Sequence, residues 1–377
     1  MKTQLTTVLV SLALGAALPV LAQTAPVSKQ TGMQLAARMT PGWNLGNSLE
    51  AIGGPYVWGS SDFNETAWGN PKATRALFDG VKAAGFNSVR IPVSWKQYAD
   101  AEDNISPQWM ARVTEVVKLA RAASLVVMIN IHWDGGWLQP TYARQEAANA
   151  RLARFWTQIA TNFRDHDDGL LFAGTNEVMV EGDYAPPTPE YCDVQRGFNQ
   201  VFVDTVRATG GNNARRHLVV QGFNTNIGYA IDCNGALPRD AVPKRLMMEV
   251  HYYDPYDFTL DANSGSWTWG QAANPGGWAN EAYTDWQFQR MKEAFVDKGV
   301  PVILGEYAAI LRTEYDAAGT YRKLWDAYVT QSAVRHGLVP VYWDNGYTSN
   351  HQMGLFDRAT GVPAFPDVTG AIVDAAK

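Results

Sequence analysis

Two glutamates stand at the ends of apolar, strand-like runs and could act together. The run at 170–179, LLFAGTNEVM, closes on Asn176 and Glu177, and the run at 301–308, PVILGEYA, closes on Glu306. Paired carboxylates suit glycoside hydrolysis, because one protonates the departing oxygen while the other, ionised, attacks the sugar carbon. Their surroundings must separate their pKa values so that each keeps its own role. We therefore predict that the two glutamates form a catalytic pair.

Polar or aromatic side chains end the other apolar runs as well. They are Asn44, Asn47, Arg90, His132, Gln221, Asn224, His251, Tyr253, Trp343 and Asp344. Taken singly, each has a plain structural explanation: an arginine in a buried ion pair, a histidine satisfied in the core, a tryptophan that only packs. Polar groups at nearly every strand end would be costly to bury unless they faced a shared cleft. The joint pattern predicts such a cleft.

Several of these residue types suit a reaction centre for sugars. Asn176 can hold a sugar hydroxyl near the reacting carbon, while Arg90 and Tyr253 can hydrogen-bond a nucleophilic carboxylate and keep it charged. Imidazoles can orient hydroxyls or tune the acid, and an indole can form the floor beneath the reacting ring; the candidates are His132, His251 and Trp343.

Short apolar runs alternate with amphipathic stretches along the chain. The expected strands are 42–47, 86–93, 125–132, 170–177, 217–223, 246–253, 301–307 and 337–345. The expected helices are 72–84, 107–123 (with Ser106 as its N-cap), 145–165, 191–209, 285–298 and 321–336, and a short helix ends the chain at 369–377. Alternating strands and helices indicate a parallel sheet.

Eight such units fit a single-domain α/β fold, the (β/α)8 TIM barrel, in which chemistry lies at the C-terminal strand ends. A doubly wound open sheet is the alternative. It is disfavoured because no GxGxxG follows the first strand.

The first residues are typical of an export signal. Lys2 precedes the apolar run VLVSLALGAALPVLA, and small residues allow cleavage after Ala22. We expect a signal peptide at 1–22 and a catalytic domain at 23–377 that is secreted or periplasmic. An uncleaved membrane anchor is the alternative; after cleavage we expect no membrane contact, because no later run is long and apolar enough to span a bilayer.

The chain has two cysteines, Cys192 and Cys233, in segments that follow strands of neighbouring units. Export would permit a disulfide between them, and two free or buried thiols are the alternative. Their spacing is not that of a CxxC redox or zinc site.

Composition limits the partners. With 31 Lys and Arg against 37 Asp and Glu, the net charge is −6, and no basic run exists, so the sequence argues against nucleic acid and anionic membranes as ligands. Fourteen tryptophans and sixteen tyrosines suit either a large aromatic core or a cleft with flat faces for sugar rings. The six histidines show no HExxH spacing, so we expect no metal and no cofactor. We expect a monomer.

Seven motifs in order resemble glycoside hydrolase family 5, and most of all its bacterial endoglucanase (cellulase) branch. They are GWNLGNSLE, VRIPVSW, NIHWDGG, GTNEV, EVHYYDPY, ILGEYA and YWDNG. The resemblance implies a retaining double displacement with Glu177 as general acid/base and Glu306 as nucleophile. It also implies supporting roles for Arg90, His132, Asn176, His251, Tyr253 and Trp343. Less tightly matched, as glycone-side contacts, are Asn47, Trp133 and Trp137.

The resemblance implies a secreted endo-β-1,4-glucanase that cleaves cellulose or related β-glucans, with a polysaccharide or oligosaccharide as its ligand. A xyloglucanase, a lichenase-type enzyme or a β-mannanase would use the same two glutamates. The non-enzyme alternative is a carbohydrate-binding protein with a barrel cleft, which would be expected to lack a glutamate; both are present. A Schiff-base aldolase would need a lysine inside a strand, and none of the expected strands contains one.

Overall fold

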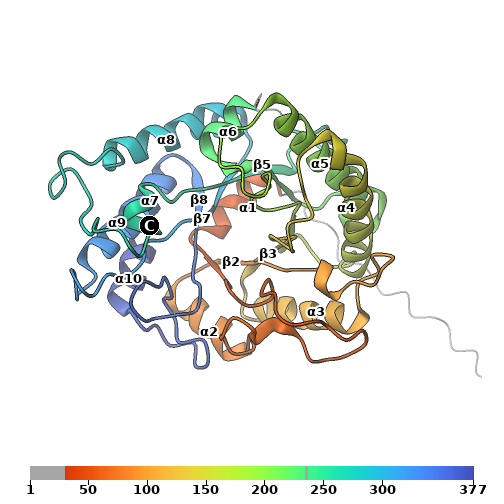
Figure 1. Ribbon diagram of the computed structural model, residues 1–377, viewed down its shortest axis with the longest axis horizontal. Helices are drawn as coiled ribbons and strands as arrows, with labels where there is room; N and C mark the ends of the chain where they lie inside the picture. Colours follow the sequence, from red (N-terminus) through yellow and green to blue (C-terminus); the bar gives the residue numbers. More distant parts are fainter. Residues whose placement is uncertain (1–29, 234–236) are drawn as a thin grey trace, which may run out of the picture.

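A closed barrel of eight parallel strands forms the centre of the molecule (Figure 1). The computed structural model describes residues 30–233 and 237–377, so the expected signal peptide lies outside the described residues. The strands are β1 (Gly42–Asn44), β2 (Ser88–Ile91), β3 (Val126–Asn130), β4 (Leu170–Ala173), β5 (Leu218–Asn226), β6 (Leu246–His251), β7 (Val302–Glu306) and β8 (Leu338–Tyr342). They pair in chain order, and β1 closes the ring against β8. The predicted (β/α)8 TIM barrel is confirmed.

Helices surround the barrel in Figure 1. Those that match predicted helices are α2 (Arg75–Ala84), α3 (Pro107–Ala122), α4 (Tyr142–Asn162), α5 (Pro189–Ala208), α8 (Glu281–Ala294), α9 (Thr320–Arg335) and α10 (Pro366–Ala375). Three short helices were not predicted: α1 (Gly32–Met39), α6 (Ile227–Asp232) and α7 (Tyr256–Thr259). Single 3-10 turns are η1 (Asn64–Thr66), η2 (Lys96–Tyr98), η3 (Gly211–Ala214) and η4 (Val296–Lys298).

The ends of α2 and α3 test the predicted capping residues. Gly85 ends α2 with φ 112°, a left-handed conformation that glycine adopts without strain. Ser106 occupies the predicted N-cap position of α3, but its hydroxyl makes no capping hydrogen bond and lies instead 2.8 Å from the hydroxyl of Tyr56. Pro107 at the first position of α3 is sufficient to start that helix.

Alternate residues of the strands fill the barrel interior in layers. The lower layers are apolar and contain Val126, Met128, Leu171, Ala173, Val219, Met247, Ile303, Val339 and Val341. Leu35, Ala36 and Met39 of α1 join the same cluster, so α1 closes the N-terminal end of the barrel. One step of two residues further along β2, β5 and β6, the interior positions become polar: Arg90, Gln221 and Glu249. The barrel therefore places a polar layer directly beneath its C-terminal strand ends.

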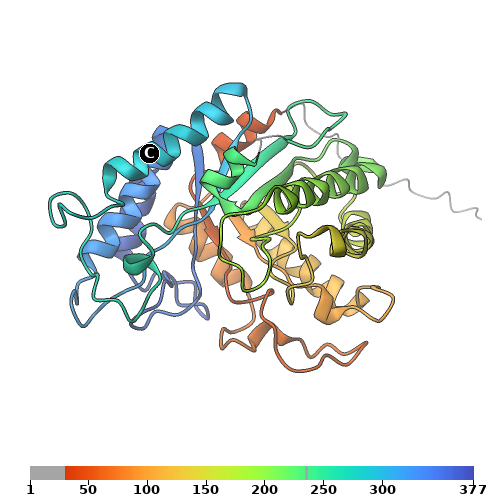
Figure 2. The same cartoon turned by 45° about the horizontal axis from the view of Figure 1, so that its top comes forward.

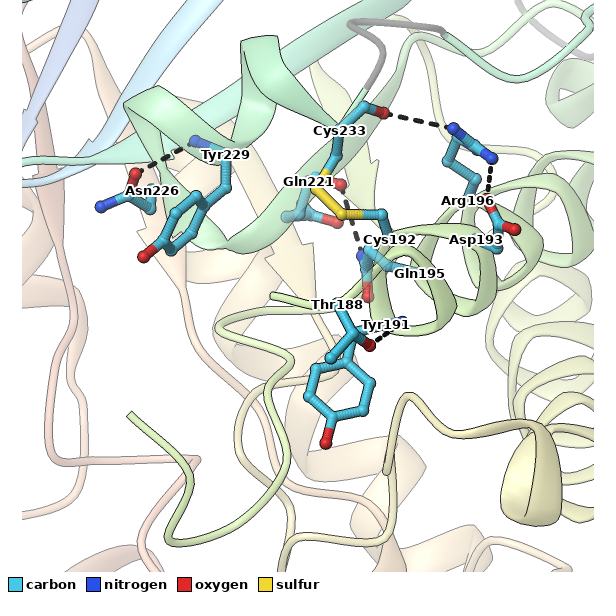
Figure 3. The surroundings of a disulfide bond; sticks show 10 residues. All are labelled: Thr188, Tyr191, Cys192, Asp193, Gln195, Arg196, Gln221, Asn226, Tyr229 and Cys233. Carbon is cyan, nitrogen blue, oxygen red and sulfur yellow. Dashed lines mark hydrogen bonds and ion pairs between the residues drawn. A yellow bond between two sulfur atoms is a disulfide. The ribbon is translucent and has the colours of Figure 1, made fainter. Parts of the chain in front are cut away.

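Outside the barrel, one covalent link joins two segments that follow the neighbouring strands β4 and β5. A disulfide joins Cys192 on α5 to Cys233, which follows α6, with a Cα–Cα distance of 5.4 Å (Figure 3). The segment after β1, orange in Figure 2, extends beyond the barrel. Within residues 30–233 and 237–377, no helix has the length and apolar character needed to cross a membrane.

Candidate active site

Glu306 is the last residue of β7, and its side chain is only 7% exposed. The Arg90 guanidinium donates to its Oε1 at 2.8 Å, and the Tyr253 hydroxyl donates to its Oε2 at 3.0 Å. Burial raises the pKa of Glu306 above its ordinary 4.5, and the nearby charges of His251 and Arg90 oppose that rise. The carboxylate is therefore fixed at both oxygens by donors that favour its ionised form.

Glu177 lies just beyond the end of β4 and is much more open, with 42% of its side chain exposed. Its Oε1 lies 2.7 Å from Nδ1 of His251. One carboxylate oxygen of Glu177 lies within 4.8 Å of one of Glu306. The fold thus brings the two predicted glutamates together from strands on opposite parts of the ring, as their positions at strand ends require.

His251, at the end of β6, is buried among three carboxylates. Its Nδ1 faces Glu177 and lies 3.6 Å from Glu306, and its Nε2 lies 3.4 Å from Glu249. Burial alone would lower the pKa of His251, but these negative charges outweigh burial and raise it to about 9. The ring is therefore an imidazolium at neutral pH that donates from both nitrogens.

Arg90 connects the two halves of the site. Besides Glu306, it donates to Oδ1 of Asn176 at 2.5 Å and to Oδ1 of Asn44 at 3.0 Å. Because the amide oxygen of Asn176 is held by the guanidinium, its NH₂ group is oriented away from that cation. Asn176 stands beside Glu177 and lines the same hollow, so its NH₂ can donate to a sugar hydroxyl there.

His132 and Trp343 form a flat face at the side of the cleft. Their rings are nearly parallel, at 5° between planes and 5.9 Å between centroids. Burial and the charge of Arg90 lower the pKa of His132 well below 6.5, so this histidine is neutral. Gly46 makes room for the indole, because a Cβ there would lie 3.0 Å from it.

Two hollows meet at Glu177. The first, of about 350 Å³, is lined by His132, Trp133, Asn176, Met179, Glu181 and Tyr184, among others. The second, of about 290 Å³, is lined by Asn224, His251, Tyr253, Asp254, Tyr256 and Gln287, among others. Such volumes suit small ligands or individual sugar rings. The more exposed carboxylate therefore borders the open space on both sides.

The three less tightly matched residues lie in different settings. Trp133 is 52% exposed and lines the first hollow. Trp137 is half-buried: its Nε1 donates to Asp134 at 2.9 Å, and its ring packs edge-on against Phe155. Asn47 has φ 56°, and its backbone N–H donates to Glu50. Of the three, Trp133 is thus the one that lines the same hollow as Glu177.

A cation could in principle be held by Glu177, His251 and Glu306, whose ligand atoms lie within 4.8 Å of one another. Nδ1 of His251 is already engaged by Oε1 of Glu177, at 2.7 Å. Glu306 is also already paired with Arg90. The donor set fits an ion-paired carboxylate network, and the expectation of no metal stays a prediction.

Two supporting residues were missed in the sequence. Glu249 sits inside β6, two residues before His251 and on the same face of the strand, and a carboxylate within an apolar run was the available signal. Asp134 is also buried: its Oδ1 accepts from the backbone N–H of Trp95 at 2.6 Å, and its Oδ2 holds Trp137. Asp134 therefore shapes the loop that carries Trp133.

Comparisons with known proteins agree with this geometry. The family described as "Cellulase (glycosyl hydrolase family 5)" matches residues 51–349. The xyloglucan-specific endo-β-1,4-glucanase BoGH5A of Bacteroides ovatus is 46% identical over 349 residues, covering 88% of this chain and 68% of that protein. Endoglucanase A of Paenibacillus barcinonensis is 39% identical, covering 93% and 92% of the two chains.

A solved structure gives the same result. The Bacteroides ovatus GH5 xyloglucanase in complex with a XXXG heptasaccharide superposes with a TM-score of 0.85 at 43% identity, covering 93% of this chain and 77% of that one. The family match, the barrel and the paired glutamates together confirm the resemblance seen in the motifs: the chain belongs to glycosyl hydrolase family 5 and is a glycoside hydrolase.

Proposed function

We propose that this protein is an exported, retaining endo-β-1,4-glucanase. The observation that carries the proposal is the short separation of its two carboxylates, with oxygens within 4.8 Å of each other. Retaining glycosidases place their carboxyl groups roughly 5–5.5 Å apart, whereas inverting enzymes leave roughly 6.5–9.5 Å for a water molecule. The separation favours direct attack by one carboxylate over attack by an intervening water.

In the first step of the proposed mechanism, a carboxylate oxygen of Glu306 forms a bond to the anomeric carbon while the bond from that carbon to the glycosidic oxygen breaks. Glu177 gives its proton to the departing oxygen. In the second step, Glu177 takes a proton from water, the resulting hydroxide attacks the same carbon, and Glu306 is released as a carboxylate. Two inversions give net retention.

The contrasting surroundings of the glutamates support this division of roles. Glu306 is buried and bound by Arg90 and Tyr253, so it is held in place as an anion. Glu177 borders open space on two sides, where it can reach both a leaving group and an incoming water. The imidazolium of His251 contacts both and can stabilise whichever carboxylate is charged.

The most direct test combines stereochemistry and polymer length. Proton NMR of the first product formed from cellotetraose should show the β-anomer, which later mutarotates; an α-anomer as first product would contradict retention. On carboxymethylcellulose and barley β-glucan, viscosity should fall quickly while little reducing sugar appears. A slow fall in viscosity with abundant small sugar would contradict endo-cleavage.

A second candidate substrate is xyloglucan, since two relatives of this chain carry that substrate in their names. The xyloglucan-specific relative is 46% identical, and the superposed xyloglucanase structure is a complex with a XXXG heptasaccharide. Initial rates on xyloglucan and glucomannan, measured beside the two unbranched glucans, decide the preference. A strong preference for xyloglucan would keep the catalytic pair and assign specificity to the loops around it.

Export and the monomeric state belong to the proposal as well. Residues 1–22 carry the sequence features of a signal peptide. A disulfide between Cys192 and Cys233 fits an oxidising compartment. N-terminal sequencing of the protein recovered from the medium or periplasm should begin at Gln23, and light scattering should give the mass of one chain.

A further inference from the structure

Glu249 is an ionisable side chain that the mechanism above does not use, although it is fully buried directly beneath the site. It lies on β6, and the alternation of that strand places Met247, Glu249 and His251 on the same inner face. Acidic side chains are almost never fully buried unless they are paired. Its partners therefore indicate why it is there.

Its partners come from the neighbouring strand β5, from β2 across the barrel and from β6 itself. Nε of Arg90 lies 2.8 Å from Oε1 of Glu249, and Nε2 of His251 lies 3.4 Å from the same oxygen. Nε2 of Gln221 donates to Oε2 at 2.6 Å. Arg90 binds Glu306 with another nitrogen, and His251 binds Glu177 with its other nitrogen. Glu249 thus contacts the residue that holds the nucleophile and the residue that holds the acid.

A third connection runs through Gln221. Its Oε1 accepts from the backbone N–H of Thr175 at 3.0 Å and from the Thr175 hydroxyl at 3.1 Å. Thr175 immediately precedes Asn176 and Glu177 in the chain. Glu249 is therefore linked to the backbone that carries the acid as well as to its imidazole partner.

The residue before the nucleophile leaves space for this carboxylate. A Cβ at Gly305 would lie 2.2 Å from Oε1 of Glu249, closer than real side chains allow. Any other residue at 305 would displace either Glu249 or the backbone next to Glu306. Residues of four strands, β2, β5, β6 and β7, therefore shape the space around the buried carboxylate of Glu249.

We propose that Glu249 is a positioning residue, which fixes Arg90 and His251 against the two catalytic carboxylates from below. This rests on the proposed roles of Glu177 and Glu306. A buried charge that is well paired sets geometry more than it adds stability, and misplacement of a catalytic group by about 1 Å can cost on the order of 10²-fold in rate.

The charges around Glu249 explain why its own charge matters. Arg90 and His251 are the two cations that face it, and Glu177 and Glu306 are the other two anions of the cluster. His132, across the site, is neutral. Burial works against the charged form of Glu249, but Arg90 and His251 lower its pKa to about 2, so it stays ionised. Removing its charge leaves Nε2–H of His251 without an anionic acceptor.

The substitution Glu249→Gln tests the proposal, because it keeps the shape of the side chain and removes only the charge. We expect kcat on a soluble β-glucan to fall on the order of 10²-fold with KM little changed, since Glu249 lies beneath the cleft. We also expect the pKa of His251, followed by NMR of its ring, to drop below the value measured for the wild-type protein. The alkaline limb of kcat should move to lower pH with it.

Glu65→Gln is the matched control. Glu65 is equally buried and pairs with Arg112 at 2.8 Å, but it lies on η1, away from the catalytic pair. It should lower the unfolding temperature and leave the pH profile and the His251 titration unchanged. A loss of activity in Glu249→Gln with an unchanged pH profile and His251 titration would reduce Glu249 to a structural role and overturn the proposal.

One measurement needs no variant and remains decisive if Glu249→Gln fails to fold. In the wild-type protein, the His251 ring should carry a proton on both nitrogens at pH 7; a neutral ring would overturn the proposal. If the proposed function itself were wrong, Glu306→Ala would retain turnover, whatever the protonation state of His251.

Discussion

Glu177 and Glu306, the two proposed catalytic glutamates, occupy opposite environments although their oxygens approach within 4.8 Å. The side chain of Glu306 is 7% exposed and has donors on both oxygens. The side chain of Glu177 is 42% exposed, and His251 contacts one of its oxygens. The first half of the site is closed and charge-compensated, and the second half is open.

This difference in exposure matches what each step of the proposed mechanism requires of its carboxylate. A nucleophile must stay ionised and must not move, so fixed donors in a dry setting are useful. A group that gives and then takes back a proton must meet a leaving group and a water molecule in turn, so it needs access. The following predictions test whether the closed and open halves really carry these separate tasks.

The largest effect should come from Glu306→Ala. Removing the attacking oxygen leaves no route to the covalent intermediate, so kcat should fall by at least about 10⁴-fold on every substrate, whatever its leaving group. Folding should survive, because Arg90 keeps its pairing with Glu249. Turnover is measured with both a β-glucan and 2,4-dinitrophenyl cellobioside.

Calorimetric binding of cellotetraose serves as the control for that variant, and binding should persist, since the open half of the site is intact. Full activity of the variant on either substrate would exclude Glu306 as the nucleophile and would remove the basis for contrasting the two halves.

A selective effect should follow from Glu177→Ala. General acid catalysis contributes about 10²–10⁴-fold, so kcat on a polysaccharide should fall by that amount. The first step with a dinitrophenyl leaving group needs no proton and should be much less affected. Added azide, which needs no general base, should restore turnover of the activated substrate by attacking the glycosyl-enzyme.

Equal losses of kcat/KM, which reports the first step alone, on the two substrates would contradict an acid role for Glu177. Glu115→Ala, which changes an exposed glutamate on α3, should leave both rates unchanged.

Much of this arrangement could be predicted because strand ends of a parallel barrel meet on one face. Glu177, Glu306, Arg90 and His251 could be assigned to that face without knowing any distance. What could not be predicted was the layer below. Glu249 lies inside an apolar run, where the strand pattern alone does not reveal that Arg90 of β2, Gln221 of β5 and His251 of β6 are its partners.

Irregular and short elements were also beyond the sequence pattern. β5 was expected to end near 223, but it continues to Asn226 through Asn224 and Thr225, both with positive φ. Helix α1 has a capping box between Thr31 and Gln34, yet only eight residues follow, too few for a clear helical period. Its helical state depends on packing against the N-terminal end of the barrel.

The smallest and most specific effect concerns the closed half alone. Tyr253 donates to Oε2 of Glu306 at 3.0 Å, and this hydrogen bond favours the ionised carboxylate. Because burial raises the pKa of Glu306, the acidic limb of kcat/KM should lie above pH 4.5, with activity rising as pH increases through it. Tyr253→Phe removes a donor to the charged form, so the pKa rises further. A hydrogen bond to a charged group contributes about 1.5–3 kcal/mol, which corresponds to an upward shift of the limb of about one pH unit or more.

Tyr252→Phe is the matched control for this shift, because the neighbouring hydroxyl contacts Thr284 at 2.9 Å, outside the site. It should leave the limb in place. If Tyr253→Phe moved the limb to lower pH, or if Tyr252→Phe moved it equally, the closed half would not be set by donors to Glu306. A shift confined to Tyr253→Phe would show that hydrogen bonds keep the nucleophile ionised against the cost of burial. That is the difference between Glu306 and the open, solvated Glu177.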